Sequence, residues 1–299
     1  MNKMKKILDF HKHFAMFMFF CLTITSCEKP MIPDGYNVSP DGNLIVSVAT
    51  IEQMPFPGFA TRTTIDEACT RLSFVVYDSL GTRVAYQNQE SDEKSFGTAG
   101  FRVSPGRYQV VVVAHGADGN PITTNASKIQ FTKATGFADT FLSNTSDVVV
   151  KDSTENVKAN LNRIVSLCRV VISDTIPADV SKMHFEYKGG SGSFDASTGL
   201  GVPVKNSKQE MTFPVKPGSA STVLDLYTFL PEDAESIHVK AEALDENDNL
   251  LLSREFDVPM KYRQITKLSG SFFTGFSGSA ISIIIDLNAD WDGEEEIKY

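Results

Sequence analysis

Cys27 is the residue in this chain whose surroundings point most directly to covalent chemistry. It closes the stretch LTITSC (22–27), in which an aliphatic residue and two small residues precede the thiol. This order resembles a bacterial lipobox, where small residues admit a signal peptidase and the nucleophilic cysteine sulfur takes up a diacylglycerol group. The alternative is an ordinary signal peptide with a chance cysteine. We expect Cys27 to be the lipidation site, with an S-diacylglycerol and an N-acyl group.

The residues before Cys27 have the features of an export signal. Four lysines make the start of the chain positive, and residues 14–24 are almost wholly apolar. That apolar run is close to the roughly 7–15 residues of a signal-peptide core and shorter than the ~20 residues that span a bilayer. We therefore expect residues 1–26 to be a lipoprotein signal peptide. Residues 27–42, rich in Pro, Gly and Asp, are expected to form a flexible tether.

The charge of the chain argues against electrostatic partners. Loss of the leader, with its four Lys and one Asp (a net of +3), would change the net charge from −9 to −12. No basic patch or stripe is visible, so neither nucleic acid nor an anionic lipid surface is expected to bind through charge. The expected membrane link is therefore covalent. Each methylene of an acyl chain that is buried in the bilayer adds about 0.8 kcal/mol to membrane affinity.

Two cysteines remain for the folded part of the chain. Cys21 lies within the expected leader, whereas Cys69 and Cys168 lie within or beside strand-like runs. An exported protein meets oxidising conditions, so a disulfide between them is one interpretation. Two separate buried thiols are the other.

No catalytic or metal-ligating arrangement stands out elsewhere. The histidines after the leader are His115, His184 and His238, which are far apart in the sequence. We expect structural or surface histidines rather than zinc ligands. Ser91 and Lys94 match S-x-x-K by letters only, in a polar loop without companion motifs. We predict no enzyme activity, no cofactor and no metal site.

Three further stretches resemble binding loops but miss essential positions. KGGSGSFDASTG (188–199) lacks the spacing of a phosphate-binding loop, so we expect a hairpin or an irregular loop. DENDN (245–249) and DLNADWDGEEE (286–296) begin like calcium loops, but Leu250 and Trp291 stand where glycine is required. We interpret the first of these two as a turn and the second as a solvated acidic tail.

Short runs of β-branched and aromatic residues, separated by turn residues, fill the rest of the chain. Turns at 78–81, 104–107 and 245–249 each separate two such runs. The run Val110–Val113 has no alternation, which is typical of a central strand buried on both faces. The segment from 115 to about 146 is expected to be looser. Strands that recur every ~8–12 residues predict an all-β chain of the sandwich class.

The run VKANLNRIVSLCRVVISDT (157–175) is the expected junction between two domains. Part of its apolar spacing also fits a helix, but its alternation and β-branched content favour a strand. We expect an N-terminal β-sandwich over residues 43–158 and a C-terminal β-sandwich over residues 159–299.

Six stretches, taken in order, resemble the fimbrial anchor (FimB-like) lipoproteins of type V pili, within the fimbrillin superfamily. They are ACTRLSFVVYDSLGTRV, GRYQVVVVAHG, LNRIVSLCRVVISD, GSFDASTG, DLYTFLP and KYRQITKLSGSFF. Each alone would fit many β-sandwiches, so their order together with the lipobox carries the resemblance. It implies two tandem transthyretin-like β-sandwich domains and a non-enzymatic protein of the fimbrium, lipid-anchored at the cell outer membrane and active in cell adhesion.

The resemblance also implies partners and a way of binding them. In this family a strand from one subunit completes a sheet of the next, and the anchor keeps its lipid and stays at the fibre base. The expected partners are therefore other fimbrial subunits, major or accessory pilins, and the outer membrane through the covalent lipid.

Two alternatives remain beside the anchor. Stalk subunits of this superfamily lose the lipid and an N-terminal strand by cleavage after an arginine, and Arg62 in FATRTT is the candidate processing site. An ordinary loop arginine is the simpler explanation of that residue. A polymerising stalk or tip fimbrillin is thus the first alternative. A surface glycan-binding lipoprotein is the second, although Trp291 is the only tryptophan available for stacking on sugars.

Overall fold

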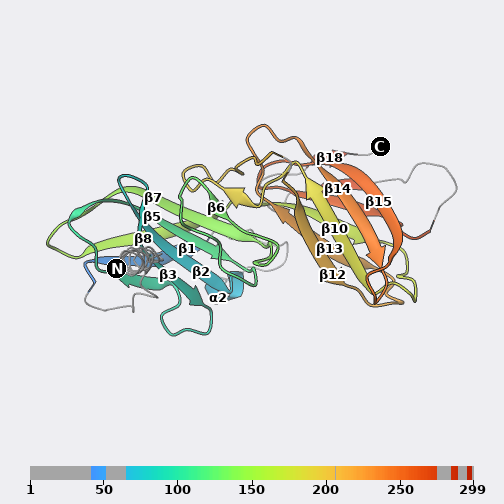
Figure 1. Ribbon diagram of the computed structural model, residues 1–299, viewed down its shortest axis with the longest axis horizontal. Helices are drawn as coiled ribbons and strands as arrows, with labels where there is room; N and C mark the ends of the chain where they lie inside the picture. Colours follow the sequence, from blue (N-terminus) through green and yellow to red (C-terminus); the bar gives the residue numbers. More distant parts are fainter. Residues whose placement is uncertain (1–41, 52–64, 206, 275–283, 289–294, 298–299) are drawn as a thin grey trace, which may run out of the picture. The chain divides into compact units, whose positions relative to one another are not determined.

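The computed structural model describes residues 42–51, 65–205, 207–274, 284–288 and 295–297. Within these ranges the chain is built from strands, and the one helix is a single turn, α2 (Ile65–Ala68). The all-β prediction is confirmed. Figure 1 shows the strands gathered into sheets, with the hairpin of β14 and β15 beside β10.

The first half of the chain forms a seven-stranded sheet in the order β3-β2-β5-β7-β8-β1-β4. The strands are β1 (Leu44–Ile51), β2 (Arg71–Asp78), β3 (Arg83–Glu90), β4 (Thr98–Phe101), β5 (Gly106–His115), β7 (Thr140–Val150) and β8 (Glu155–Arg163). The prediction that residues 110–113 lie in a central strand is confirmed, because β5 lies between β2 and β7 and these valines are buried.

This sheet folds over to enclose a core. Strands β7 and β8 share only two residue pairs, Phe141 with Arg163 and Leu142 with Asn162. Apolar side chains from strands on both sides of that junction meet in one cluster, which includes Leu44 of β1 and Phe74 of β2. Burial of such side chains contributes about 1.5–3 kcal/mol each. The two layers of the sandwich follow from that shared core.

The second half contributes two more sheets that face each other. One has the order β12-β10-β14-β15 and the other β13-β9-β16-β17-β18. Their strands are β9 (Ser166–Ile172), β10 (Lys182–Lys188), β12 (Gln209–Pro214), β13 (Thr222–Thr228), β14 (Ser236–Leu244), β15 (Leu250–Pro259), β16 (Ile265–Gly270), β17 (Ile284–Asn288) and β18 (Glu295–Ile297). A second apolar cluster takes side chains from both sheets, among them Phe185 of β10 and Leu226 of β13.

The glycine-rich stretch 188–199 is a packed connection, which agrees with the irregular loop expected from the sequence. It carries β11 (Ser193–Phe194), which pairs antiparallel with β6 (Ile129–Gln130) in a small two-stranded sheet. Phe194 is fully buried in a third apolar cluster, together with Val75 of β2 and Ile265 of β16. Residues far apart in the sequence therefore share this cluster.

Gly190 shows why this stretch needs glycine. A Cβ atom at this position would overlap the Thr228 hydroxyl and lie 2.9 Å from Thr228 Cβ. Thr228 is buried and its hydroxyl donates to Gln209 Oε1 at 2.5 Å, so it has little room to move. The glycines here serve close packing between strands.

The turn expected at 245–249 is confirmed. It joins β14 and β15, and the Asp245 carboxylate accepts hydrogen bonds from the backbone N–H groups of Asn247 and Asn249, both at 2.8 Å. Such side-chain to backbone bonds are typical of Asx-turns, so the acidic residues here form a hairpin rather than a cation loop.

Several expectations about elements were incomplete or wrong. The region expected to be loose already contains β7 from Thr140, because Phe141 and Leu142 are needed in the core. The run 157–175 is strand, as favoured, but it is divided into β8 and β9 by Ile164 and Val165. The acidic end, expected to be a solvated tail, contributes Glu295–Ile297 to β18, paired with β17.

The expected domain boundary after residue 158 remains a prediction. It falls inside β8, whose residues 155–161 pair in parallel with β1 of the first sheet. A division that kept this strand whole would lie at Ile164 and Val165, between β8 and β9.

Asp174 fixes the backbone of residues 272–274, at the end of the described segment 207–274. Its carboxylate accepts hydrogen bonds from three consecutive backbone N–H groups, those of Phe272, Phe273 and Thr274, at 2.7–2.8 Å. Partial burial raises the pKa of Asp174, but the backbone bonds, first that from Phe272, outweigh it and the pKa lies below its ordinary value of 3.8. Charged hydrogen bonds of this kind favour the ionised form.

Replacing Asp174 by asparagine is expected to lower the free energy of unfolding at neutral pH by about 1 kcal/mol. The value is low because the site is partly exposed. A depressed folded pKa contributes stability above the unfolded value, which is lost as the pH falls through the folded pKa. The difference in free energy of unfolding between wild type and variant should therefore become smaller below pH 3.8. Urea unfolding at several pH values measures this, with exposed Asp233→Asn as the control. A difference that does not change with pH would contradict the assignment.

Candidate functional site

Cys27 and Arg62, the residues expected to carry lipid and processing, lie outside the described residues. Strand β1 lies between them in the sequence, and its position is well defined. Residues 44–51 of β1 pair in parallel with β8, and Leu44–Ser47 pair antiparallel with β4. Leu44 and Val46 are fully buried in the first core. The strand that follows the expected tether is therefore an interior strand of a sheet.

Other strands leave one edge without a described partner. In the first sheet these are β3 and β4, and in the other two sheets they are β12, β13, β15 and β18. An edge strand has a row of N–H and C=O groups that another chain can pair with. Strand β15 spans 10 residues, and Leu250 and Leu251 at its start are 57% and 42% exposed.

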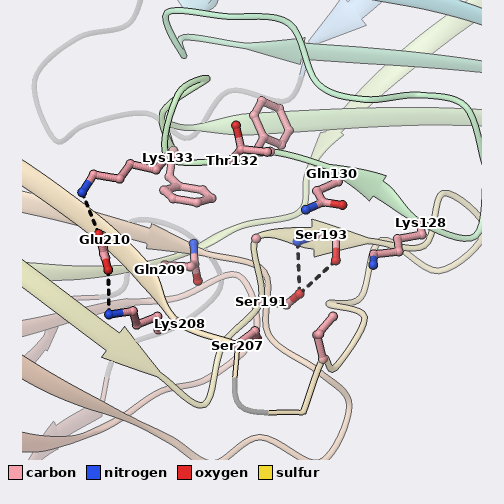
Figure 2. A pocket seen from close by; sticks show the side chains of 14 residues that line it. Lys128, Gln130, Thr132, Lys133, Ser191, Ser193, Ser207, Lys208, Gln209 and Glu210 are labelled. Carbon is pink, nitrogen blue, oxygen red and sulfur yellow. Dashed lines mark hydrogen bonds and ion pairs between the residues drawn. The ribbon is translucent and has the colours of Figure 1, made fainter.

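A first pocket, of about 380 Å³, lies beside the small β6–β11 sheet and the start of β12 (Figure 2). Lys133 and Lys208 approach Glu210 from two sides, at 2.6 and 2.8 Å. These bonds, first that from Lys133, lower the pKa of Glu210 to about 2. Lys128 is a third cation of the lining, so Glu210 offsets only part of the positive charge of this pocket.

A second pocket, of about 390 Å³, is lined mainly by polar side chains. It opens over the outer face of β7 and β8, and residues 196–199 and 262–263 complete it. Its lining includes the asparagines 144, 160 and 162 together with Lys158 and Arg263. Sequence reasoning missed this site, and the available signal was the alternation of polar and apolar residues in KANLN (158–162).

The two cysteines do not pair. Both thiols are free and buried, Cys69 in the first core and Cys168 in the second. Burial, and then the charge of Asp66 or Asp225, raises the pKa of each thiol to about 12. Neither thiol is a nucleophile at neutral pH, because the thiolate is the reactive form. Of the two interpretations, separate buried thiols is confirmed.

The three histidines lie in different surroundings. His115 is fully buried and packs edge-on against Phe131, with ring centroids 5.0 Å apart. Burial, and then the charge of Arg71, lowers the pKa of His115 to about 4, so the ring is neutral at pH 7. His184 and His238 are solvent-facing strand residues bonded to Thr212 and Asp257.

Within the described ranges, no three His, Cys, Asp or Glu side chains gather closely enough to hold a metal ion. In the same part of the chain, no helix combines the length and the apolar character needed to cross a membrane.

Comparison with solved structures finds matches at low sequence identity. The fimbrial anchor protein Mfa2 from Porphyromonas gingivalis is 10% identical, with a TM-score of 0.43 over 82% of this chain and 96% of that one. A fimbrial assembly protein from Parabacteroides distasonis is 13% identical, with a TM-score of 0.39 over 83% and 96%. A Bacteroides ovatus protein with a provisional cell-adhesion designation is 14% identical, with a TM-score of 0.47 over 87% and 100%.

The match to a family model is the finding that assigns the chain. A search of curated proteins found no match. Residues 58–292, well over half of the 299-residue chain, match the model of the fimbrillin-A associated anchor proteins Mfa1 and Mfa2. The resemblance to fimbrial anchors seen in the sequence is thereby confirmed, and the chain belongs to the family of fimbrillin-A associated anchor proteins.

Proposed function

We propose that this protein is a non-enzymatic, lipid-tethered fimbrial anchor that holds the base of a fibre at the outer membrane. It binds another pilin by β-strand complementation. The observation that carries the proposal, beside family membership, is the position of β1 (Leu44–Ile51) between β8 and β4. This strand follows Cys27 in the sequence and precedes Arg62.

The position of β1 links the lipid to the folded body. The strand makes seven register pairs with β8 and four with β4, and its side chains at 44 and 46 are in the core. A pull on acylated Cys27 would act along β1 and would have to shear these ladders. The lipid would therefore stay connected to the folded protein for as long as β1 stays in its sheet, as an anchor requires.

The alternative, a polymerising stalk or tip fimbrillin, would use the same strand differently. Cleavage after Arg62 would separate Cys27 and β1 from the remainder of the chain. Loss of β1 would leave β8 and β4 without their shared neighbour and open a slot lined by apolar side chains. A strand from another subunit could fill that slot.

The chemical state of the N-terminus separates these two functions. Protein isolated from assembled fimbriae is expected to begin at an acylated Cys27, and intact mass spectrometry measures this directly. An Arg62→Gln variant should begin at the same acylated Cys27, with a mass that differs only by the substitution itself, because an anchor is not processed there. A chain that begins at Thr63 would identify a stalk or tip subunit instead.

Strand complementation in the anchor should use a sheet edge. The slot between β8 and β4 is already filled by β1, so an incoming strand must pair elsewhere. Strand β15 is the longest edge strand of the described residues and begins with exposed Leu250 and Leu251.

Hydrogen exchange in a mixture with a fimbrial subunit tests this binding mode. The amides of β15 are expected to gain protection, since new ladder bonds slow their exchange. The interior strand β5 serves as the internal control and should not change. Binding without new protection at any strand edge would contradict complementation, and protection confined to β8 and β4 would indicate that β1 had been replaced.

A further inference from the structure

The end of the first sheet at which β1 begins is the end that the expected tether reaches first. Leu44 opens β1 and pairs with Glu155, which opens β8. Strands β2, β4, β5 and β7 reach the same end, as three residue pairs show: Leu44 with Phe101, Asp78 with Tyr108, and Gly106 with Val150. Three connections complete this surface, which is called here the tether end: residues 78–82, 102–105 and 151–154.

Asn43 fastens the start of β1 to one of these connections. Its side-chain amide donates to Val103 C=O at 2.8 Å, and its Oδ1 accepts from Val103 N–H at 2.9 Å. Its backbone C=O accepts from Glu155 N–H, also at 2.9 Å. The point at which the tether meets the folded protein is therefore fixed in relation to the connections around it.

The turn 78–82 has an apolar side chain at its tip and a well-fixed backbone. The Asp78 carboxylate accepts hydrogen bonds from the N–H groups of Leu80 and Thr82, both at 2.9 Å, and Gly81 has a φ of 78°. Leu80 is 88% exposed, the largest fraction for any large apolar side chain of the described residues. Gly, Pro, Asn, Asp and Ser dominate turns. This turn therefore keeps a leucine in water at a fixed position.

Other exposed apolar side chains lie at or beside the tether end. Val84 is the second residue of β3 and Val149 is the last but one of β7. Ile122 lies next to Thr123, whose hydroxyl accepts from Arg83 Nη1 at 2.9 Å, just after the turn. With Leu80, four of the nine exposed large apolar side chains of the described residues thus gather here. Such a grouping is typical of a surface that contacts a protein or a membrane.

The charge of the tether end favours a membrane as its partner. The three connections contain two acidic residues, Asp78 and Asp152, and two basic residues, Arg102 and Lys151, so their charges sum to zero. The chain as a whole has a net charge of −9. Anionic headgroups repel a surface with that average charge, but they do not repel a neutral one.

The length of the tether keeps this end near the lipid. The 16 residues from 27 to 42 span at most about 55 Å, since each residue adds no more than ~3.3–3.6 Å. Linkage over so short a length gives an effective concentration of about 1 mM. A contact too weak to bind a free protein to a membrane is therefore occupied once the protein is tethered. A single leucine can orient the protein in this way, although it cannot replace the acyl chains.

We propose that the tether end rests on the lipid surface to which Cys27 is attached, with Leu80 inserted among the headgroups. The leucine side chain lies about 5–10 Å deep, at the boundary between headgroups and acyl chains. This inference rests on the lipid tether of the proposed function and adds an orientation to it. The first sheet faces the membrane with the end at which β1 begins.

Spin-labelled lipids test the contact in the acylated chain, reconstituted in vesicles of phosphatidylethanolamine and phosphatidylglycerol. A Leu80→Cys variant takes an environment-sensitive fluorophore at that position alone, because Cys69 and Cys168 are buried and the Cys27 sulfur is acylated. Its emission is expected to shift to the blue and to fall at least about twofold when lipids spin-labelled near the headgroup are included. Leu250→Cys, at an exposed leucine of β15, is the matched control and should not change.

Each other result contradicts the proposal or the tether, and the two can be told apart. A fluorophore at residue 80 that stays in water, or equal quenching at residue 250, would overturn the proposal. A blue shift without quenching would also overturn it, because a protein would then cover the turn. If the tether itself is wrong, the chain lacks the acyl mass and does not float with the vesicles. An oligohistidine tag in place of Cys27, on vesicles with nickel-chelating lipid, then tests the contact alone.

Replacing Leu80 by aspartate tests the leucine itself. A fluorophore at Ser153→Cys, on the connection 151–154, reports how close the tether end stays to the lipid. Its quenching is expected to weaken about threefold in Leu80→Asp, because a carboxylate is costly to move out of water. Leu250→Asp is the matched control and should leave the quenching unchanged. Thermal melting confirms that both variants are folded, and equal quenching in the two would show that Leu80 makes no membrane contact.

Discussion

Replacing Cys27 by alanine is expected to transfer the protein from the membrane fraction to the soluble fraction. Without the thiol there is no diacylglycerol, and each acyl methylene lost removes about 0.8 kcal/mol of membrane affinity. The acidic chain, with a net charge of −9, has no electrostatic hold on anionic lipid to replace the acyl chains. The membrane-bound share should fall by about tenfold or more. Fractionation and immunoblotting measure it, and the fimbriae of the same cells should be shed.

Cys21→Ala is the matched control for this experiment. Cys21 lies six residues before Cys27, inside the apolar part of the expected leader. Its replacement should leave the mature protein unchanged and membrane-bound. A Cys27→Ala protein that stays in the membrane fraction would show that the attachment is not a lipid on this sulfur. The proposal of an anchor at the fibre base would then be wrong.

Replacing Gly190 by alanine is expected to destabilise the fold strongly. The new methyl would overlap the Thr228 hydroxyl, and the Gln209–Thr228 hydrogen bond limits any movement of that side chain. Overpacking of this kind costs about 1–3 kcal/mol and occasionally more, so we expect ~3 kcal/mol. For a chain of this size, that corresponds to a fall in Tm of about 6–12 °C.

Two further variants make the Gly190 result specific. Gly116→Ala should have little effect, because a Cβ there would meet only Ala138 Cβ at 3.8 Å. Combining Gly190→Ala with Thr228→Ala should recover part of the lost stability, since the overlapping hydroxyl is gone. Calorimetry of the four proteins measures these differences. Equal Tm values for the two glycine variants would contradict the packing argument.

The two buried thiols bear on the redox behaviour of the protein. Cys69 and Cys168 belong to separate apolar clusters, and burial raises the pKa of both to about 12. The described residues of this protein thus contain no disulfide. Its stability rests on the packing of its sheets, and reducing agents should leave it unchanged.

Much of the fold could be predicted because strand and turn signals are local. The all-valine run at 110–113 and the turns at 78–81 and 245–249 each identified an element that the structure contains. The hydrophobic periodicity of a strand and the chemistry of a turn depend on a few neighbouring residues, so these elements can be predicted from a single sequence.

Other features depended on residues distant in the sequence. The start of β7 at Thr140 was not predicted from the sequence. A polar, glycine-containing stretch ends there, and the residues that follow adopt a strand because they fill the core. The position of β1 beside β8, more than 100 residues away, has no local signal at all. Pairing partners of strands are chosen by the tertiary fold.

The amino-acid sequence by itself determined that this protein is all-β, pointed to Cys27 as the lipidation candidate and carried the resemblance to fimbrial anchors that family membership bears out. Only the tertiary structure decided that the thiols stay apart, that β1 is an interior strand and that a second pocket opens over β7 and β8. The physical reason is that motifs and strand periods are properties of neighbouring residues. Thiol separation, strand order and pocket walls instead depend on segments up to about 120 residues apart, brought together when apolar surfaces are buried.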